Sequence, residues 1–208
     1  SPLDLIVISH GHSDHWEPEL VNQIQARTSA TVAAPPALAD KLRQVRTKSP
    51  LIPLLDRSGT NSERLPDLVS MLLGQEITIG GTTLTALRCD HAAVEPLAFQ
   101  VRSPDGVTVY LPGDTTPFPE MGHLPHVGSA ETLHNQIHQR GVDVLCWMGT
   151  ALADGAEIAN LVQPRAFWGY AINPPAAGER AYGILTRLTP NIPFQAMDRG
   201  QVFAWPAD

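Results

Sequence analysis

The hydrophobic pattern of the first fifty residues predicts two strand–helix pairs. Residues 3–9 form a short and almost wholly apolar run, which is typical of a buried strand. A helical spacing of apolar residues follows Pro18, and proline favours the first turn of a helix. Residues 31–34 repeat the strand pattern, and a second helical spacing runs from Pro36 to about Val45.

The pattern then breaks and returns as β structure. Residues 46–66 contain several prolines and mixed polar residues, so we expect a long loop there that helps to select a substrate. From Glu76 the apolar residues alternate, and Gly80-Gly81 predicts a hairpin turn. A second hairpin is expected at Pro104-Asp105-Gly106, between strands at 97–101 and 107–111.

Helical and strand patterns alternate again in the last third of the chain. The expected helices are 129–140, 154–162 and 176–188, and the expected strands are 142–147, 166–172 and 201–205. This order predicts one mixed α/β layered domain over residues 1–208, a length that suffices for one hydrophobic core.

Composition narrows the class of protein. With 43% hydrophobic and 17% charged residues the chain is not disordered, and no apolar run approaches the ~18 residues that span a bilayer. A net charge of −7 argues against a nucleic-acid surface, so we expect a small-molecule substrate, with no nucleic acid and no membrane as partner. Two cysteines, Cys89 and Cys146, form no disulfide framework, which fits a reducing, cytoplasmic location.

Histidine is the residue that stands out, because three of the eight lie in the run His10-Gly11-His12-Ser13-Asp14-His15. Extended spacing places His10 and His12 on the same side of the chain, and Asp14 and His15 can point to a second spot nearby. Imidazole and carboxylate suit zinc, manganese or iron, so the run predicts one or two divalent ions, with zinc first. The alternative is a solvated histidine-rich turn, in which nothing would order four potential ligands.

Two further polar groups follow predicted strands. Asp90-His91 comes after the strand that contains residues 84–88, and Asp114 comes after the strand at 107–111. Layered sheets often place their sites at strand ends, although each group alone is compatible with an ordinary loop. Ser9, Asp90 and Thr115 are candidates to accept hydrogen bonds from the second nitrogen of a ligand histidine.

Three segments together resemble the metallo-β-lactamase superfamily. Residues 7–15 resemble its signature, residues 74–81 leading into Cys89-Asp90-His91 resemble its next segment, and residues 111–115 resemble its bridging-aspartate motif. The resemblance runs from residue 3 to about residue 172. Among the branches, the chain is most similar to the lactonase-like metal-dependent hydrolases.

The resemblance implies an αββα four-layer sandwich with the site at one edge. It implies that a metal-bound hydroxide attacks a small ester, lactone or phosphoester, and that Asp14 orients the hydroxide and passes a proton to the leaving group. The implied ligands are His10, His12 and His91 at one metal and Asp14 and His15 at the other, with Asp114 bridging the two.

The sequence departs from this family in two places. No histidine occurs after His138, so either Phe167 or Ala171 stands where the family supplies its last ligand, and the second metal site would be weakened. His123 and His126 are candidates to replace that ligand. In this family, several strands usually precede the first motif, and they are absent from this sequence. Either these strands have been cut away, or we expect an open sheet edge that another chain, such as a second copy, or a rearranged N-terminus covers.

These departures leave two further hypotheses beside the hydrolase. One is a metal-binding module that has lost catalysis, together with the last ligand. The other is oxidoreductase chemistry at a di-iron site, which would need an electron-carrying partner domain.

Overall fold

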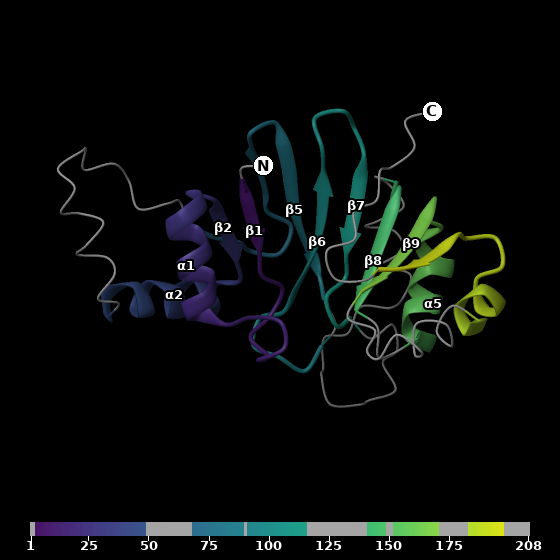
Figure 1. Cartoon of the computed structure of the whole chain (residues 1–208), viewed down its shortest axis with the longest axis horizontal. Coiled ribbons are helices and arrows are strands. Elements are labelled where there is room, and N and C mark those ends of the chain that lie inside the picture. The colour runs from purple at the N-terminus through teal and green to yellow at the C-terminus, as the bar shows by residue number, and fades with distance from the viewer. Residues whose placement is uncertain are drawn as a thin grey trace. The chain divides into compact units, whose positions relative to one another are not determined.

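The structure, a computed structural model, describes residues 3–48, 68–89, 91–115, 141–148, 152–170 and 183–197. The chain forms two compact units, Ser1–Phe99 and Gln100–Asp208, and strand β6 (Leu97–Arg102) leads from the first into the second (Figure 1). In the described ranges no helix is long and apolar enough to cross a membrane.

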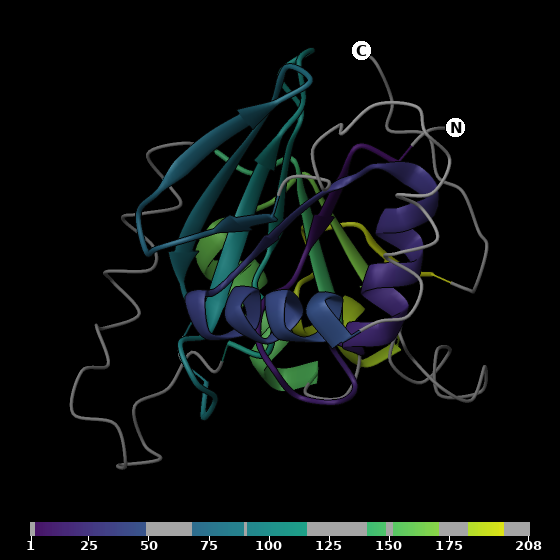
Figure 2. The same cartoon turned by 90° about the vertical axis from the view of Figure 1, so that its left-hand side faces the viewer.

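The first unit contains a three-stranded parallel sheet with two helices packed on it (Figure 2). Its elements in chain order are β1 (Leu5–Val7), α1 (Pro18–Thr28), β2 (Thr31–Ala34), α2 (Pro36–Lys48) and β3 (Leu68–Ser70). The strand order is β1-β2-β3, so β1 and β3 are the edge strands of this sheet. The expectation that a second copy of the chain covers an open sheet edge stays a prediction.

Apolar residues from both helices and the sheet form the core of the first unit. It contains Ile8, Val21, Val32, Ala34, Leu38 and Leu42. Burying such side chains is the main force that holds the helices on the sheet. Helix α1 begins as the Pro18 spacing predicts, and the carboxylate of Glu17 accepts hydrogen bonds from the backbone amides of Glu19 and Leu20.

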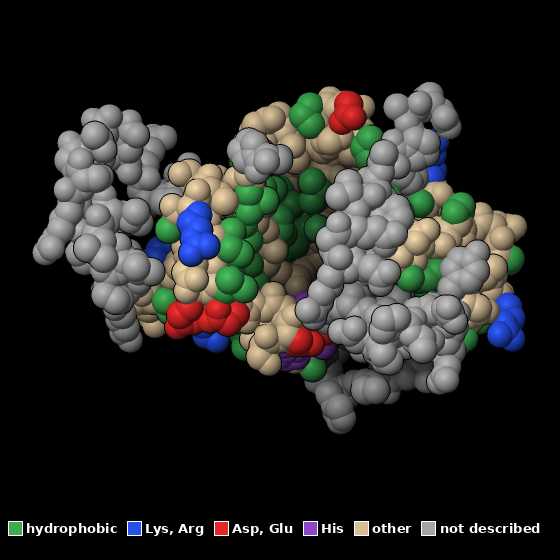
Figure 3. Space-filling model, viewed as in Figure 1, with side chains coloured by type: hydrophobic (Ala, Val, Ile, Leu, Met, Phe, Trp, Pro, Cys, Tyr) green, Lys and Arg blue, Asp and Glu red, His purple; other side chains and the backbone are tan. Residues whose placement is uncertain are grey.

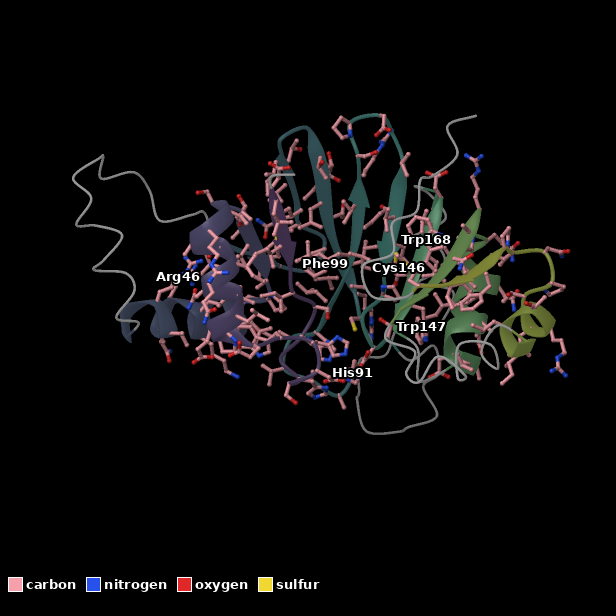
Figure 4. The ribbon with its side chains drawn as sticks, viewed as in Figure 1. Arg46, His91, Phe99, Cys146, Trp147 and Trp168 are labelled. Atoms are coloured by element: carbon pink, nitrogen blue, oxygen red, sulfur yellow. The ribbon has the colours of Figure 1, made fainter. Side chains whose placement is uncertain are left out.

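A polar contact joins the two helices. The buried guanidinium of Arg46 donates to Asn22 Oδ1 at 3.2 Å and to Gln25 Oε1 (Figure 4). This contact explains one difference from the expected pattern. We expected the helix to end near Val45 and a loop to begin at residue 46, but α2 continues to Lys48 because Arg46 is anchored on α1.

The predicted hairpin follows in the first unit. Strand β4 (Glu76–Ile79) pairs antiparallel with β5 (Thr82–Arg88), with Ile79 opposite Thr82. Gly80 and Gly81 connect them with φ of 56° and 84°. Two successive left-handed residues form the tight turn that glycine permits at low cost.

The second unit is a parallel sheet in the order β7-β8-β9-β10 among its described strands. These strands are β7 (Thr108–Leu111), β8 (Val144–Met148), β9 (Ala166–Tyr170) and β10 (Phe194–Ala196). Helix α5 (Leu152–Val162) connects β8 to β9, and Gly155 of this helix lies directly on the ring of Trp147. The core includes Tyr110, Leu145 and Phe167, which are fully buried.

Most expected elements in the described ranges are confirmed. Strands β3 and β10 were not predicted, because each has only three residues and no clear alternation. A helical segment occupies 183–188, within the helix expected at 176–188. The expected helix at 129–140, the expected strand at 201–205 and residues 49–66 of the expected loop lie outside the described residues.

Candidate metal centre

Two of the candidate ligands lie in the loop that follows β1. The ladder between β1 and β2 ends where the Ile8 amide donates to the carbonyl of Ala33 at 2.9 Å. His10 comes two residues later and is completely buried, whereas His12 is exposed. The His10 ring is therefore buried in the first unit, and the His12 ring lies at its surface.

A turn then brings the last two residues of the motif into place. The amides of His15 and Trp16 both donate to the carbonyl of His12, at 3.0 and 3.1 Å. The His15 side chain is 7% exposed and its Nε2 lies 3.7 Å from Asp14 Oδ2, whereas the Asp14 side chain is 65% exposed. Asp14 and His15 thus point to a common spot at the surface, as their spacing predicts.

Gly11 allows this loop to lie directly on helix α2. A Cβ atom added at Gly11 would be 3.0 Å from Leu38 Cδ2, which is a tight contact for a Cβ atom. Leu38 belongs to the core cluster and is itself almost fully buried. A side chain at this position, between the two candidate ligands His10 and His12, would therefore require Leu38 to shift.

The third candidate histidine comes from the segment after β5. The amide of Ala93 donates to the carbonyl of His91 at 2.9 Å, which forms a turn at this residue. Farther along, the amide of Leu97 donates to the carbonyl of Ser9 at 2.9 Å. This hydrogen bond joins the segment after His91 to Ser9, the residue that precedes His10. Asp90 lies outside the described residues.

The three imidazoles converge within the first unit. The ring centroids are 4.8 Å apart for His10–His12, 4.7 Å for His10–His91 and 4.9 Å for His12–His91. His12 Nδ1 and His91 Nε2 are 3.1 Å apart, and one ligand nitrogen of each of the three rings lies within 4.8 Å of the others. Figure 4 shows His91 beside the loop after β1, and Figure 3 shows histidine side chains at the surface next to acidic ones.

This donor set fits a divalent metal ion. Two nitrogens that bind one tetrahedral zinc at about 2.0–2.1 Å lie about 3.3 Å from each other. The His12–His91 separation of 3.1 Å is close to that value. Neutral imidazole nitrogens from three side chains form a recognised zinc ligand set.

The candidate ligand His10 has a hydroxyl beside one of its two ring nitrogens. Ser9 Oγ lies 3.0 Å from His10 Nδ1. When Nδ1 carries the ring proton and donates it to the hydroxyl, Nε2 is the nitrogen that carries the lone pair with which a metal could be bound. The Nε2 atom of His10 is buried. The expected supporting role of Ser9 therefore has a contact in the structure.

The remaining candidate ligand, Asp114, belongs to the second unit. It follows β7 in a turn where Gly113 has φ of 62° and the Thr115 hydroxyl donates to the carbonyl of Pro112 at 2.6 Å. Thr115 is buried and bonded within its own turn. The bridging role expected of Asp114 stays a prediction.

The two positions considered for the family's last ligand offer no donor. Phe167 is fully buried and packs edge-to-face on Phe194, with ring centroids 5.2 Å apart, so it is a core residue. Ala171, His123 and His126 lie outside the described residues. The late strand instead contributes hydrophobic packing.

Sequence reasoning did not single out Glu95, whose carboxylate reaches helix α2 from the segment after His91. A signal for it exists in the chain. Pro35 and Pro36 stand at the start of a helix, and neither has a side chain that can accept a hydrogen bond from the first backbone amides. An acceptor for these amides must therefore come from another segment of the chain.

Known proteins resemble this chain in family and in fold. A family model described as a beta-lactamase superfamily domain matches residues 1–168. CmlA, a diiron beta-hydroxylase from Streptomyces venezuelae, is 14% identical with a TM-score of 0.61, and the alignment covers 94% of this chain and 44% of CmlA. The metallo-beta-lactamase fold protein YhfI from Bacillus subtilis is 13% identical with a TM-score of 0.63, over 97% of this chain and 78% of YhfI.

A third solved structure, a diphosphatase of the PhnP family, is 15% identical with a TM-score of 0.48, over 80% of this chain and 59% of that one. Among proteins of curated function, none matches this chain. The αββα fold class expected from the sequence is confirmed by the family match and by the likeness to YhfI. The chain spans less than half the length of CmlA.

Proposed function

Because the chain belongs to the metallo-β-lactamase superfamily, we propose that it is a metal-dependent hydrolase of a small ester, lactone or phosphoester. One observation carries the proposal. Three imidazoles from two distant segments converge, with His12 Nδ1 and His91 Nε2 3.1 Å apart, and a carboxylate and a fourth imidazole, those of Asp14 and His15, lie in the loop after β1.

The residues divide into two groups of ligands. His10 Nε2, His12 Nδ1 and His91 Nε2 would hold one ion, for which three imidazoles make zinc the first choice. Asp14 and His15 would hold a second ion, and Asp114 would bridge the two, as the family resemblance implies. A bound ion of this kind lowers the pKa of a coordinated water to about 7, which makes a nucleophile available at neutral pH.

Asp14 is the residue that we assign to proton handling. Its carboxylate is well exposed and so is accessible to a substrate, and it lies 3.7 Å from His15 Nε2. A carboxylate in this place can orient the attacking water, accept its proton and deliver that proton to the leaving group. Ser9 would support this chemistry indirectly, by fixing the ring of His10 through the 3.0 Å contact.

A second candidate function follows from the late strand. Phe167 is a core residue, so on that alignment the second ion has one ligand fewer than the family usually supplies. A site with only the three-histidine ion would serve one-metal chemistry. Alternatively, a chain that binds only this ion would be a metal-binding module without catalytic activity.

The test combines metal analysis with a hydrolysis screen. Purified protein is titrated with zinc, manganese and iron, and then assayed on generic esters, lactones and phosphodiesters with and without added metal. We expect metal-dependent hydrolysis by the wild-type chain. The His12→Ala variant should lose metal and activity together, whereas Asp14→Asn should keep the three-histidine ion and lose turnover.

Three results would contradict the proposal in different ways. An unchanged metal stoichiometry in His12→Ala would refute the ligand assignment. A fully loaded protein that hydrolyses none of the substrates would favour the binding module. A preference for iron together with redox activity would favour the di-iron oxidoreductase.

A further inference from the structure

The first turn of helix α2 touches both segments that carry the ligand histidines. Leu38 lies under Gly11, between His10 and His12. The neighbouring residue, Ala37, donates its backbone amide to Glu95 Oε2 at 3.1 Å, and Glu95 belongs to the segment that follows His91. Two adjacent residues of one helix therefore contact two loops that are far apart in the sequence.

The Ala37 amide needs an acceptor from outside the helix. The carbonyl of Pro35 accepts from the amides of Leu38 and Ala39, at 3.0 and 2.9 Å. Pro36 has no amide hydrogen, and neither proline has a side chain that can accept a hydrogen bond. The first turn of α2 contains no acidic residue. The first turn of the helix therefore offers no acceptor for the Ala37 amide, and the positive end of the helix favours a carboxylate there.

Glu95 provides that carboxylate from 58 residues away, in an unusual backbone conformation. Its φ is 47°, in the left-handed region that side chains rarely adopt, and the residue after it is Pro96. Such strain persists only where surrounding contacts hold it. Here the contacts are the Glu95–Ala37 bond and the bond from the Leu97 amide to the carbonyl of Ser9.

We propose that Glu95 is a positioning residue that holds the His91 segment against helix α2, so that His91 lies beside His10 and His12. The contact fixes His91 relative to the same helical turn that supports Gly11. It therefore sets the distance between the two ligand segments. The proposal rests on the proposed function in so far as these histidines bind a metal.

The test compares three variants with the wild-type chain. Glu95→Ala removes the carboxylate, and Glu95→Gln keeps an acceptor oxygen of the same reach without the charge. Asp40→Ala is the matched control, because Asp40 is an exposed acid on the same helix whose partner is Arg43, at 2.5 Å. Zinc affinity is measured by competition with a chromophoric chelator. The ring contact between His12 and His91 is measured by NMR in the metal-free protein.

We expect Glu95→Ala to weaken zinc binding by up to about tenfold and to lose the ring contact, because removal of the carboxylate that caps helix α2 releases the His91 segment. Glu95→Gln should fall between Glu95→Ala and wild type, and Asp40→Ala should match wild type. Wild-type affinity and an intact ring contact in Glu95→Ala would overturn the proposal. So would an equal loss in Asp40→Ala.

Failure of the proposed function would look different. If the wild-type chain binds none of zinc, manganese and iron, the hydrolase proposal is wrong. The ring contact in the metal-free protein still decides whether Glu95 positions His91, because that measurement needs no metal.

Discussion

His12 Nδ1 and His91 Nε2 lie 3.1 Å apart although 79 residues separate them in the sequence. The first follows strand β1 and the second follows strand β5, so the fold alone brings them together. Two imidazole nitrogens that share one hydrogen bond in the free protein are also spaced to share one metal ion. The predictions below concern the contacts that maintain this spacing.

Ser9→Ala should weaken metal binding without unfolding the protein. The substitution removes the oxygen that lies 3.0 Å from His10 Nδ1, so the ring loses the partner that favours Nε2 as ligand. We expect the dissociation constant for zinc to rise about 10–100-fold. Long-range ¹⁵N spectra of the metal-free protein should show a change in the tautomer of His10.

Two variants control this measurement. Ser9→Thr keeps the hydroxyl and should retain most of the affinity, whereas Ser13→Ala changes an exposed serine of the same loop and should have no effect. An identical zinc affinity in Ser9→Ala and the wild-type protein would show that Ser9 has no part in the site.

Gly11→Ala should destabilise the protein by about 1–3 kcal/mol, because the new Cβ would lie 3.0 Å from the buried side chain of Leu38. Chemical denaturation gives the free energy of unfolding. In the Leu38→Val background the same substitution should cost less, since the valine is shorter. Equal costs in the two backgrounds would mean that the clash is not with Leu38.

The motif in the loop after β1 could be predicted from the sequence, and its position relative to His91 could not. Alternation along an extended chain predicts that His10 and His12 lie on one side, and their ring centroids are 4.8 Å apart. The approach of His91 was expected only from the family resemblance. Two long-range hydrogen bonds, from the Leu97 amide to Ser9 and from the Ala37 amide to Glu95, join the segment after His91 to the rest of the first unit, and hydrophobic periodicity predicts neither of them.

Strands β3 and β10 were not predicted for a similar reason, because tertiary contacts and not the local sequence pattern determine them. Strand β3 pairs with β2, with Ala33 opposite Val69, and β10 pairs with β9, with Trp168 opposite Gln195. Such short segments become strands because a neighbouring strand offers hydrogen bonds, so tertiary context overrides a weak local preference. The same holds for the last turn of α2, which the contact of Arg46 with Asn22 stabilises.

Gly155→Ala should destabilise the second unit. An added Cβ would lie 2.9 Å from the Trp147 ring, whose side chain is buried under α5 (Figure 4). The expected cost is about 1–3 kcal/mol in the free energy of unfolding. Gly183→Ala is the matched control, because it lies in a helical segment with nothing within 4 Å of the added atom.

Gly183→Ala should be neutral or stabilising by up to about 1 kcal/mol, since alanine favours the helix over glycine. Of the two variants, only Gly155→Ala should therefore lose stability. Thermal unfolding of both chains measures this difference, and a similar loss of stability in the two would contradict the packing that we describe.

Burial raises the pKa of the Cys146 thiol from 9.0 to about 11. The unfolded chain therefore loses this proton at a lower pH than the folded chain does. The resulting stability is fully present below pH 9 and declines as the pH rises from 9 towards 11, by on the order of 2 kcal/mol.

Cys146→Ala should remove this part of the pH dependence. The measurement is the free energy of unfolding of both proteins between pH 8 and 11, so that other groups which titrate in this range cancel in the difference. A constant difference between the two proteins over this range would contradict the assigned burial of the thiol.

Anomalous diffraction from crystals grown with zinc tests the central claim most directly. We predict a zinc peak within bonding distance of the ligand nitrogens of His10, His12 and His91, and a second, weaker peak at Asp14 and His15. The absence of any peak among the three histidines in zinc-saturated crystals would contradict the metal centre, and with it the hydrolase.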